Sequence, residues 1–184
     1  ADRTEKVLEK PVEKVNFFAA MNGLFRLRSF NLLLILWSLI GFVGWMIVGW
    51  LPTYYKEQFS LSQTLSGLYA TGYLYPASIV GLLLGGFWAD RWSRTNKKGR
   101  ILVPLIGLAV AAPCVFAASY TNALFLAILF FMIYALTRMF VDTNLMPILC
   151  LVADSRYRAT GYGVLNLFST VVGGIGLYAA GVMR

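Results

Sequence analysis

The stretch "GGFWADRWSRTNKKGR" (85–100) places six charged residues between two long segments that carry almost no charge. About 20 consecutive apolar residues are enough to cross the ~30 Å hydrocarbon layer of a membrane. The whole chain is 59% hydrophobic and 13% charged, whereas soluble domains are about a quarter charged. A charged run between two such segments is typical of a loop that joins transmembrane helices. The sequence therefore predicts an all-α polytopic membrane protein.

Outward from this loop, the apolar pattern predicts five membrane-spanning helices. They cover about residues 31–53, 65–88, 101–118, 122–150 and 161–183. The fourth is longer than one crossing requires, so we expect it to protrude or to bend near Pro147. Prolines are also expected to interrupt the second span (Pro76) and the third (Pro104 and Pro113). Residues 31–184 form this transmembrane part, and residues 1–30 form a linker whose amphipathic end, 17–30, could lie along the membrane surface.

Lysine and arginine alternate between the two sides of these spans. They are frequent in 1–30, 90–100 and 154–158, whereas 54–64 holds only Lys56 and the turn at 120–121 holds none. By the positive-inside rule, the three basic segments and the amino end face the cytoplasm. Five spans then leave the carboxyl end outside, which fits a truncated even-numbered bundle better than a complete one.

Three polar residues lie within the fourth span at helical spacing. Tyr134, Arg138 and Asp142 are four residues apart, which puts them on one helix face. Charges at this depth cost a few kcal/mol and usually face a water-filled cavity or a partner. An arginine there suits a carboxylate substrate. Alternatively, Arg138 and Asp142 pair with each other and only hold the helix in place. Asp142 is also the candidate for proton coupling.

Aromatic and amide side chains in other spans add weaker substrate-binding candidates. Tyr69 and Tyr73, four residues apart in the second span, could line a sugar-sized cavity, or could anchor the helix at the membrane interface. Trp45 and Asn166 are candidates of the same kind.

Motifs for enzyme chemistry are missing from the sequence. The chain has no histidine, no phosphate-cradling loop and no cysteine pair at ligand spacing, since Cys114 and Cys150 lie singly in apolar segments. We therefore expect no enzyme, no metal and no cofactor. The net charge of +8 lies mostly between apolar segments, where it indicates topology rather than nucleic-acid binding.

The segment Gly86–Phe87–Trp88–Ala89–Asp90–Arg91–Trp92–Ser93–Arg94 resembles the loop signature of the major facilitator superfamily, Gly-x-Leu-Ala-Asp-Arg-x-Gly-Arg. Trp88 and Ser93 depart from that pattern. In the family the signature joins the second and third helices of each six-helix half, and here it joins the second and third predicted spans. Three further segments resemble the anion:cation symporter branch: "RLRSFNLLLILW" (26–37), "WLPTYYKEQFSLS" (50–62) and "RYRATGYGVLNLFSTVVGGI" (156–175).

The resemblance implies the carboxyl-terminal half of a transporter, helices seven to eleven, with the twelfth helix and the amino-terminal half missing. It also implies a bacterial inner-membrane location. The implied function is alternating-access uptake of an organic anion such as a sugar acid, coupled to H⁺ or Na⁺. The alternatives are a carrier of neutral sugars or drugs, and a non-transporting five-helix scaffold or channel subunit.

The charged loop gains a conformational role under this resemblance. Asp90 is expected to accept hydrogen bonds from the free amides at the start of the fifth span, and to pair with Arg156 or Arg158. Candidates for conformational gating are Gly86, Asp90, Arg91, Arg94, Arg156 and Arg158. For Lys97, Lys98 and Arg100 we prefer a role in topology alone.

Overall fold

The computed structural model describes residues 17–96 and 98–182. Over these ranges the chain forms seven α-helices, one 3₁₀ helix and no strand. The elements are α1 (Phe17–Phe25), α2 (Arg28–Gln58), α3 (Gln63–Gly72), α4 (Leu74–Ser93), α5 (Gly99–Tyr120), α6 (Leu124–Val152), η1 (Ser155–Tyr157) and α7 (Arg158–Val182). Five helical segments, with α3 and α4 counted together, are long and apolar enough to cross a membrane. The predicted all-α polytopic fold is confirmed.

The second span is interrupted, but not at Pro76, where we expected the interruption. The helix is interrupted at Tyr73, between α3 and α4, and Pro76 is the third residue of α4. The first turn of a helix has no intrahelical partner for its N–H groups, so a proline there costs little. The prediction of an interruption at Pro76 is therefore wrong by about one turn.

Other prolines lie inside continuous helices. Pro104 and Pro113 are both within α5, so the predicted interruptions of the third span are wrong. In α6 the helix continues past Pro147 to Val152. Its 29 residues extend about 43 Å at 1.5 Å per residue, longer than the ~30 Å apolar layer. The expected protrusion of the fourth span is consistent with this length.

The amphipathic segment at 17–30 is divided between two helices. It forms α1 and the first residues of α2, which begins earlier than predicted. On α1, Ala20 and Leu24 are fully buried, whereas Phe17 and Phe18 are exposed. The helix thus has one buried face and one exposed apolar face. The predicted linker at 1–16 lies outside the described residues.

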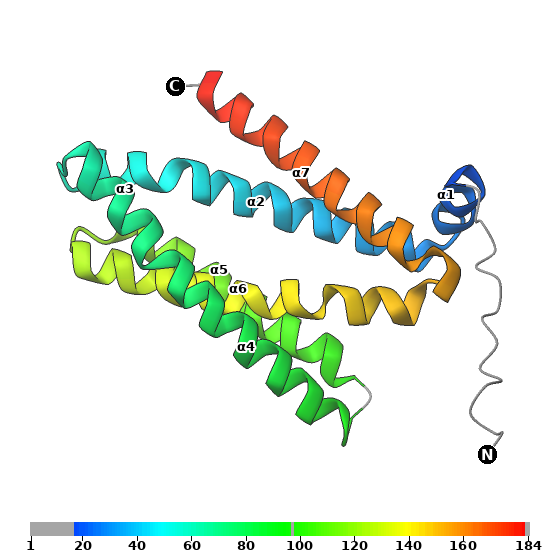
Figure 1. The fold of residues 1–184 in the computed structure, drawn as a ribbon. Helices are drawn as coiled ribbons and strands as arrows, with labels where there is room; N and C mark the ends of the chain where they lie inside the picture. The colour runs from blue at the N-terminus through cyan, green and yellow to red at the C-terminus, as the bar shows by residue number, and fades with distance from the viewer. Residues whose placement is uncertain (1–16, 97, 183–184) are drawn as a thin grey trace, which may run out of the picture.

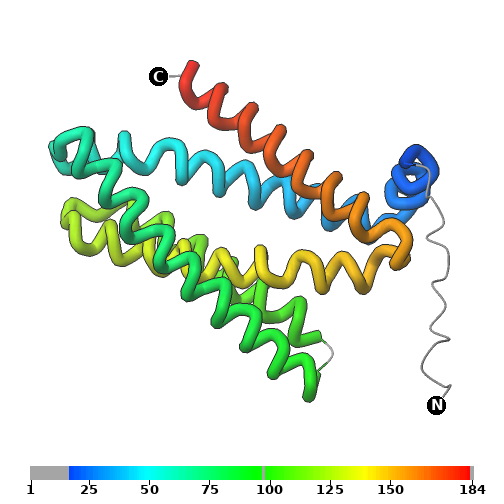
Figure 2. Tube along the Cα trace, viewed as in Figure 1, coloured from blue at the N-terminus to red at the C-terminus, as the bar shows by residue number. Residues whose placement is uncertain are grey.

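The long helices form two layers, which Figures 1 and 2 show in the same view. One layer holds α2 and α7, which pack extensively on each other; the other holds α4, α5 and α6, in which α6 packs on both of the others. Contacts of α6 with α2 and α7 are far fewer. The boundary between the layers therefore runs along α2 and α6.

Glycines on both α2 and α7 let the two helices pack closely, because each glycine makes room for a side chain of the other helix. On α2, Gly41 faces Ser169 of α7. On α7, Gly173 and Gly176 receive the rings of Trp45 and Phe42 from α2. A Cβ at any of the three glycines would collide with its neighbour. This interface is held by small residues opposite large ones, as is common in membranes.

Two apolar clusters fill the interior at opposite ends of α6. One includes Val141 and Leu145 of α6 with the first half of α2; the other includes Phe131 and Ala135 of α6 with the second half of α2. Between them, Arg138 is the middle residue of the 29 in α6. It lies about 21 Å from either end of the helix. The fold thus places a charged side chain at the midpoint of α6.

Candidate functional site

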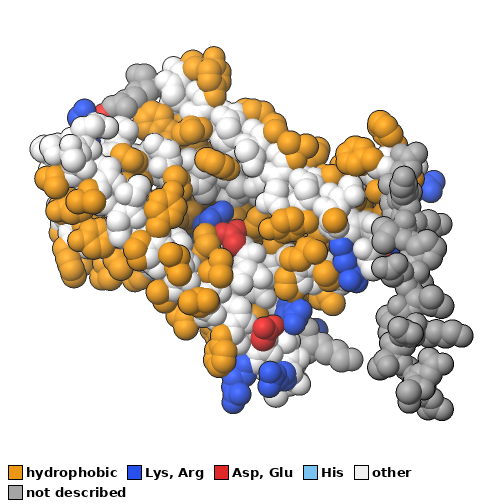
Figure 3. All heavy atoms as spheres, in the orientation of Figure 1, with side chains coloured by type: hydrophobic (Ala, Val, Ile, Leu, Met, Phe, Trp, Pro, Cys, Tyr) orange, Lys and Arg blue, Asp and Glu red, His pale blue; other side chains and the backbone are white. Residues whose placement is uncertain are grey.

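The middle of α6 carries an ion pair. Nη1 of Arg138 lies 3.0 Å from Oδ2 of Asp142, and the two side chains are only 22% and 21% exposed. Figure 3 shows a basic and an acidic side chain meeting in the middle of an otherwise apolar face. Removing either charge would leave the other unpaired in a low-dielectric environment, which is costly. The predicted alternative in which Arg138 and Asp142 pair with each other describes this contact.

The pairing leaves part of the arginine uncommitted. Its Nε is buried and has no hydrogen-bond partner among the described residues. The guanidinium lies against Gly44 of α2, where a Cβ would be 3.0 Å from Nη2 and 3.3 Å from Nε. Glycine at this position lets the arginine reach the boundary between the two layers. The guanidinium therefore still has donor capacity at the place where α2 and α6 meet.

Tyr134 adds a second unpaired donor one turn away. Its side chain is 6% exposed, and its hydroxyl has no hydrogen-bond partner within the described part of the chain. Buried hydroxyls normally find a partner, since an unmade hydrogen bond costs roughly 1–3 kcal/mol. Two unsatisfied donors on one face of α6 indicate a place where a polar ligand or ordered water would bind.

Two hollows meet at this pair of side chains. One, of about 350 Å³, lies between α2, α5 and α6. The other, of about 360 Å³, lies between α2, α4 and α6 and includes the hydroxyl residue Ser78. Tyr134 and Arg138 line both, and the remaining walls are almost entirely apolar. Apolar walls with a few convergent polar groups are usual for a small-molecule site.

The other predicted substrate residues do not line either hollow. Tyr69 of α3 contacts Tyr73, the residue between α3 and α4, with ring centroids 5.8 Å apart. Trp45 packs on Gly173 of α7. Asn166 donates to the Tyr162 carbonyl oxygen of its own helix at 2.9 Å. Of the seven candidates, the structure brings together Tyr134, Arg138 and Asp142.

Two lining residues had been missed, Gly44 and Ser78. Nothing in the sequence marks them, because their relevance arises only when α2 and α4 pack against α6. Ser78 is also engaged with its own helix, since its hydroxyl donates to the Leu74 carbonyl oxygen at 2.9 Å.

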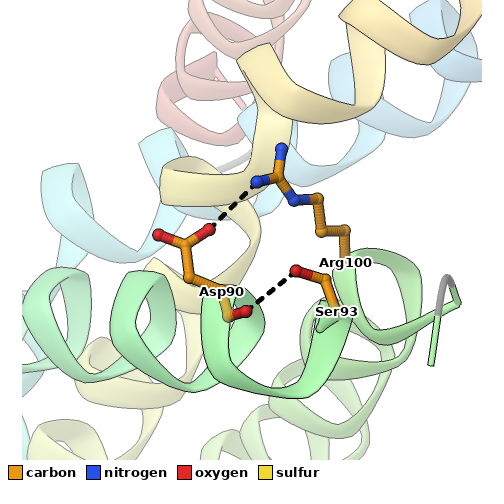
Figure 4. A network of polar contacts seen from close by, with 3 residues as sticks. All are labelled: Asp90, Ser93 and Arg100. Carbon is orange, nitrogen blue, oxygen red and sulfur yellow. Dashed lines mark hydrogen bonds and ion pairs between the residues drawn. The ribbon is translucent and has the colours of Figure 1, made fainter. Parts of the chain in front are cut away.

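The charged hairpin between α4 and α5 is closed by its own residues. Nη2 of Arg100 lies 3.1 Å from Oδ1 of Asp90, and the Ser93 hydroxyl donates to the Asp90 carbonyl oxygen at 2.9 Å (Figure 4). Figure 1 shows the end of α4 well apart from the start of α7. The prediction that Asp90 contacts the start of the fifth span is therefore wrong in this structure. Arg100, assigned to topology alone, is the residue that pairs with Asp90.

Two gating candidates, Arg156 and Arg158, make local contacts in the turn before α7. Arg158 donates to two carbonyl oxygens at the end of α6, from Nε to Ala153 at 3.3 Å and from Nη2 to Cys150 at 3.2 Å. A cation at a helix carboxyl end is favourable, because the free carbonyls there are partly negative. Asp154 accepts from the N–H of Arg156 at 3.0 Å. These contacts join α6 to α7.

Gly86 and Arg91 lie on α4, and Arg94 follows its last residue. A Cβ at Gly86 would lie 3.3 Å from the Thr143 hydroxyl oxygen of α6, so this glycine lies at a helix contact. Arg91 and Arg94 are exposed near the end of α4. In the ranges 17–96 and 98–182, no group of three or more His, Cys, Asp or Glu side chains could hold a metal ion.

Comparison with known proteins gives two matches. The family described as the Major Facilitator Superfamily matches residues 1–177. A solved structure, a bacterial homologue of the human lysosomal transporter Spinster in an inward-facing and unoccupied conformation, is similar with a TM-score of 0.75 and 23% sequence identity. The match covers 92% of this chain but only 36% of that one, so this chain spans about a third of its length. No curated protein matches.

Proposed function

Since this chain belongs to the major facilitator superfamily, we propose that it is part of a secondary active transporter that works by alternating access. In such proteins the substrate binds near the middle of the membrane, where two bundles meet. Arg138 at the centre of α6, beside two hollows on the layer boundary, supports this function for the present chain. The partner bundle would be the amino-terminal half of the same transporter. Residues 1–30 would then be its cytoplasmic linker, and residues 31–184 five helices of the second half.

The proposed cargo is an organic anion such as a sugar acid. The unpaired Nε of Arg138 and the unpaired hydroxyl of Tyr134 are both donors, and a carboxylate is an acceptor with two oxygens. This single observation carries the proposal. Asp142 would keep the guanidinium oriented, and a coupling cation, H⁺ or Na⁺, would act at Asp142 or in the partner bundle. The resemblance of three segments to the anion:cation symporter branch, and the bacterial inner-membrane location, belong to the same proposal.

A neutral cargo is the second candidate. Its support is the ion pair itself, because Asp142 already neutralises Arg138 and the other walls of both hollows are almost entirely apolar. In that case Arg138 would be structural and the cargo a sugar or an apolar drug-like molecule.

Gating is proposed for the hairpin between α4 and α5 and for the turn before α7. The Asp90–Arg100 pair would keep the ends of α4 and α5 together as one unit during the conformational change. Gly86 would let that unit slide along α6, Arg91 and Arg94 would meet the partner bundle or the membrane, and Arg156 and Arg158 would link α6 to α7. Such rocking of packed units is how alternating access proceeds.

Uptake into proteoliposomes containing the full-length protein tests the cargo. We would offer a panel of sugar acids and matched neutral sugars to the native protein, Arg138→Gln and the charge-preserving Arg138→Lys. A lost charge-assisted hydrogen bond is worth roughly 1.5–3 kcal/mol, so we expect Arg138→Gln to lower acid uptake by roughly 10- to 100-fold. Arg138→Lys should retain part of it. Uptake of neutral sugars, unchanged in Arg138→Gln, would instead support the second candidate.

A further inference from the structure

A hollow at the end of α4 has a composition unlike that of the other hollows. It has a volume of about 500 Å³ and is lined by Trp88, Arg91, Trp92, Arg94 and Thr95. Arg91 and Trp92 lie three and four residues after Trp88, so these three residues share one face of α4, and Thr95 follows just beyond the end of the helix. Two arginines and two indoles thus converge where the apolar part of α4 gives way to the charged hairpin.

The indoles form a fixed platform. The rings of Trp88 and Trp92 are stacked nearly parallel, with centroids 5.9 Å apart and an angle of 11°. Trp88 also meets the ring of Phe140 of α6 edge-on, at 5.9 Å and 89°. The contact with a second helix holds the platform in place. Indoles near the end of a membrane-spanning helix are typical of membrane interfaces, since they combine an apolar ring with one polar N–H.

The two arginines are available for an anion. Neither Arg91 nor Arg94 has an ion pair or side-chain hydrogen bond with another described residue, and both side chains are exposed. Asp90, the acid next to Arg91, is paired with Arg100. The positive charge beside the platform is therefore not neutralised within the described part of the hairpin.

Apolar side chains continue from the hollow along α4. Phe87 is 70% exposed and Leu83 65% exposed, and neither is covered by another described helix. Figure 3 shows basic side chains gathered at the tip of the α4–α5 hairpin, next to apolar ones. An amphiphile would therefore meet cationic groups at its anionic end and apolar side chains along its tails.

We propose that this hollow binds an anionic membrane lipid, with Arg91 and Arg94 donating to the phosphodiester oxygens and its acyl chains lying against Leu83 and Phe87. Phosphate oxygens are the acceptors that arginine prefers. The exposed apolar side chains favour a lipid phosphate over a free one, because a free phosphate gains nothing from them. The site does not depend on which cargo the protein carries.

Native mass spectrometry of the full-length protein in detergent tests the site. Dioleoyl phosphatidylglycerol or dioleoyl phosphatidylcholine is titrated into the native protein, Arg91→Gln, Arg94→Gln and the matched control Lys98→Gln. Each variant removes one positive charge from the same hairpin. We expect phosphatidylglycerol to bind more tightly than phosphatidylcholine, and each arginine variant to weaken the first phosphatidylglycerol about tenfold. Lys98→Gln should change it less than threefold.

Several outcomes would overturn the proposal. Equal losses in all three variants would mean diffuse attraction to the charged surface rather than a site. Competition by millimolar glycerol 3-phosphate as effective as that by the lipid would mean that the apolar side chains contribute nothing. No loss in either arginine variant would mean that the hollow is covered in the full-length protein. Circular dichroism spectra matching the native protein establish that each variant is folded, and Arg94→Lys, which keeps the charge, should retain most of the binding.

Discussion

At the scale of single residues, Arg138 and Asp142 depend on each other. Each lies in a region where an unpaired charge is costly, and their contact at 3.0 Å offsets that cost for both. A variant that neutralises only Arg138 therefore removes a cargo contact and also leaves Asp142 without its cation. Transport by Arg138→Gln has to be compared with Arg138→Gln combined with Asp142→Asn. If the double variant folds like the native protein and fails to transport acids while Asp142→Asn alone still transports them, loss of the cargo contact is the cause.

Asp154, just before η1, gives a pH-dependent contribution to stability. Its pKa is lowered, chiefly because the N–H of Arg156 donates to its carboxylate, and further by the Ser155 hydroxyl and by Arg156 and Arg158. An aspartate in an unfolded chain has a pKa of about 3.9. A lowered folded-state pKa means that the ionised group stabilises the fold above the unfolded pKa. That contribution is lost as pH falls through the folded pKa.

We expect Asp154→Asn to unfold at a lower temperature than the native protein at pH 7, because asparagine keeps an acceptor oxygen but loses the charge. The difference should shrink as pH falls below about 4, where the native aspartate also becomes neutral. Thermal unfolding followed by circular dichroism in detergent, between pH 7 and pH 3, measures it. A difference that stayed constant over that range would show that the charge of Asp154 is irrelevant.

At the scale of helices, the five spans could be predicted from the sequence but their internal breaks could not. Long apolar runs separated by charged or polar turns are a strong signal. The effect of a proline depends on its place within the helix, and Pro76 is harmless because it falls in the first turn of α4. In addition, α6 is apolar on nearly all sides, since lipid and protein neighbours are both apolar. The pattern therefore cannot show which side of α6 meets α4 and which meets α5.

Close packing of α4 on α6 requires glycine at position 81. A Cβ there would collide with the backbone of Leu136, which cannot move aside as a flexible side chain can. Gly174 on α7 is a matched contrast, because a Cβ at that position meets nothing within 4 Å. Both glycines lie inside helices, so the gain in helix propensity from alanine is the same at each.

We expect Gly81→Ala to destabilise the protein by about 1–3 kcal/mol through overpacking, and Gly174→Ala to be neutral or to stabilise it by up to about 1 kcal/mol. Thermal unfolding of the two variants in the same detergent provides the comparison. Equal midpoints would show that α4 and α6 can separate at Gly81 without loss, contrary to the packing described here.

At the scale of the whole molecule, the candidate site belongs to neither layer alone. Arg138 could be found from the sequence because a charge in an apolar span is conspicuous. Gly44 could not, since only the approach of α2 to α6 gives it a role. Trp45 and Asn166 were attractive for their side-chain chemistry, but the chain packs them on or along α7. Chemistry can be predicted from sequence, whereas which spans contribute to a site depends on tertiary packing.

The two ends of the bundle should face opposite sides of the membrane. In a background in which Cys114 and Cys150 are replaced by alanine, single cysteines at Lys98 and Ser155 should react with an impermeant maleimide only after permeabilisation. Cysteines at Ser60 and Thr121 should react in intact cells, because the basic hairpins are predicted to be cytoplasmic. The reverse labelling pattern would overturn the orientation, and the same pattern at all four sites would contradict the five crossings.

The contact between α2 and α7 has a consequence for how this sequence can change over generations. Gly41, Gly173 and Gly176 each admit a particular side chain of the other helix, so an enlargement on one helix is acceptable only after a reduction on its partner. Substitutions should consequently occur in pairs among homologous sequences, at positions 41 and 169, 45 and 173, and 42 and 176. A chimera that took only α7 from a distant homologue would break these matched pairs. A chimera that took both α2 and α7 from that homologue would keep them matched.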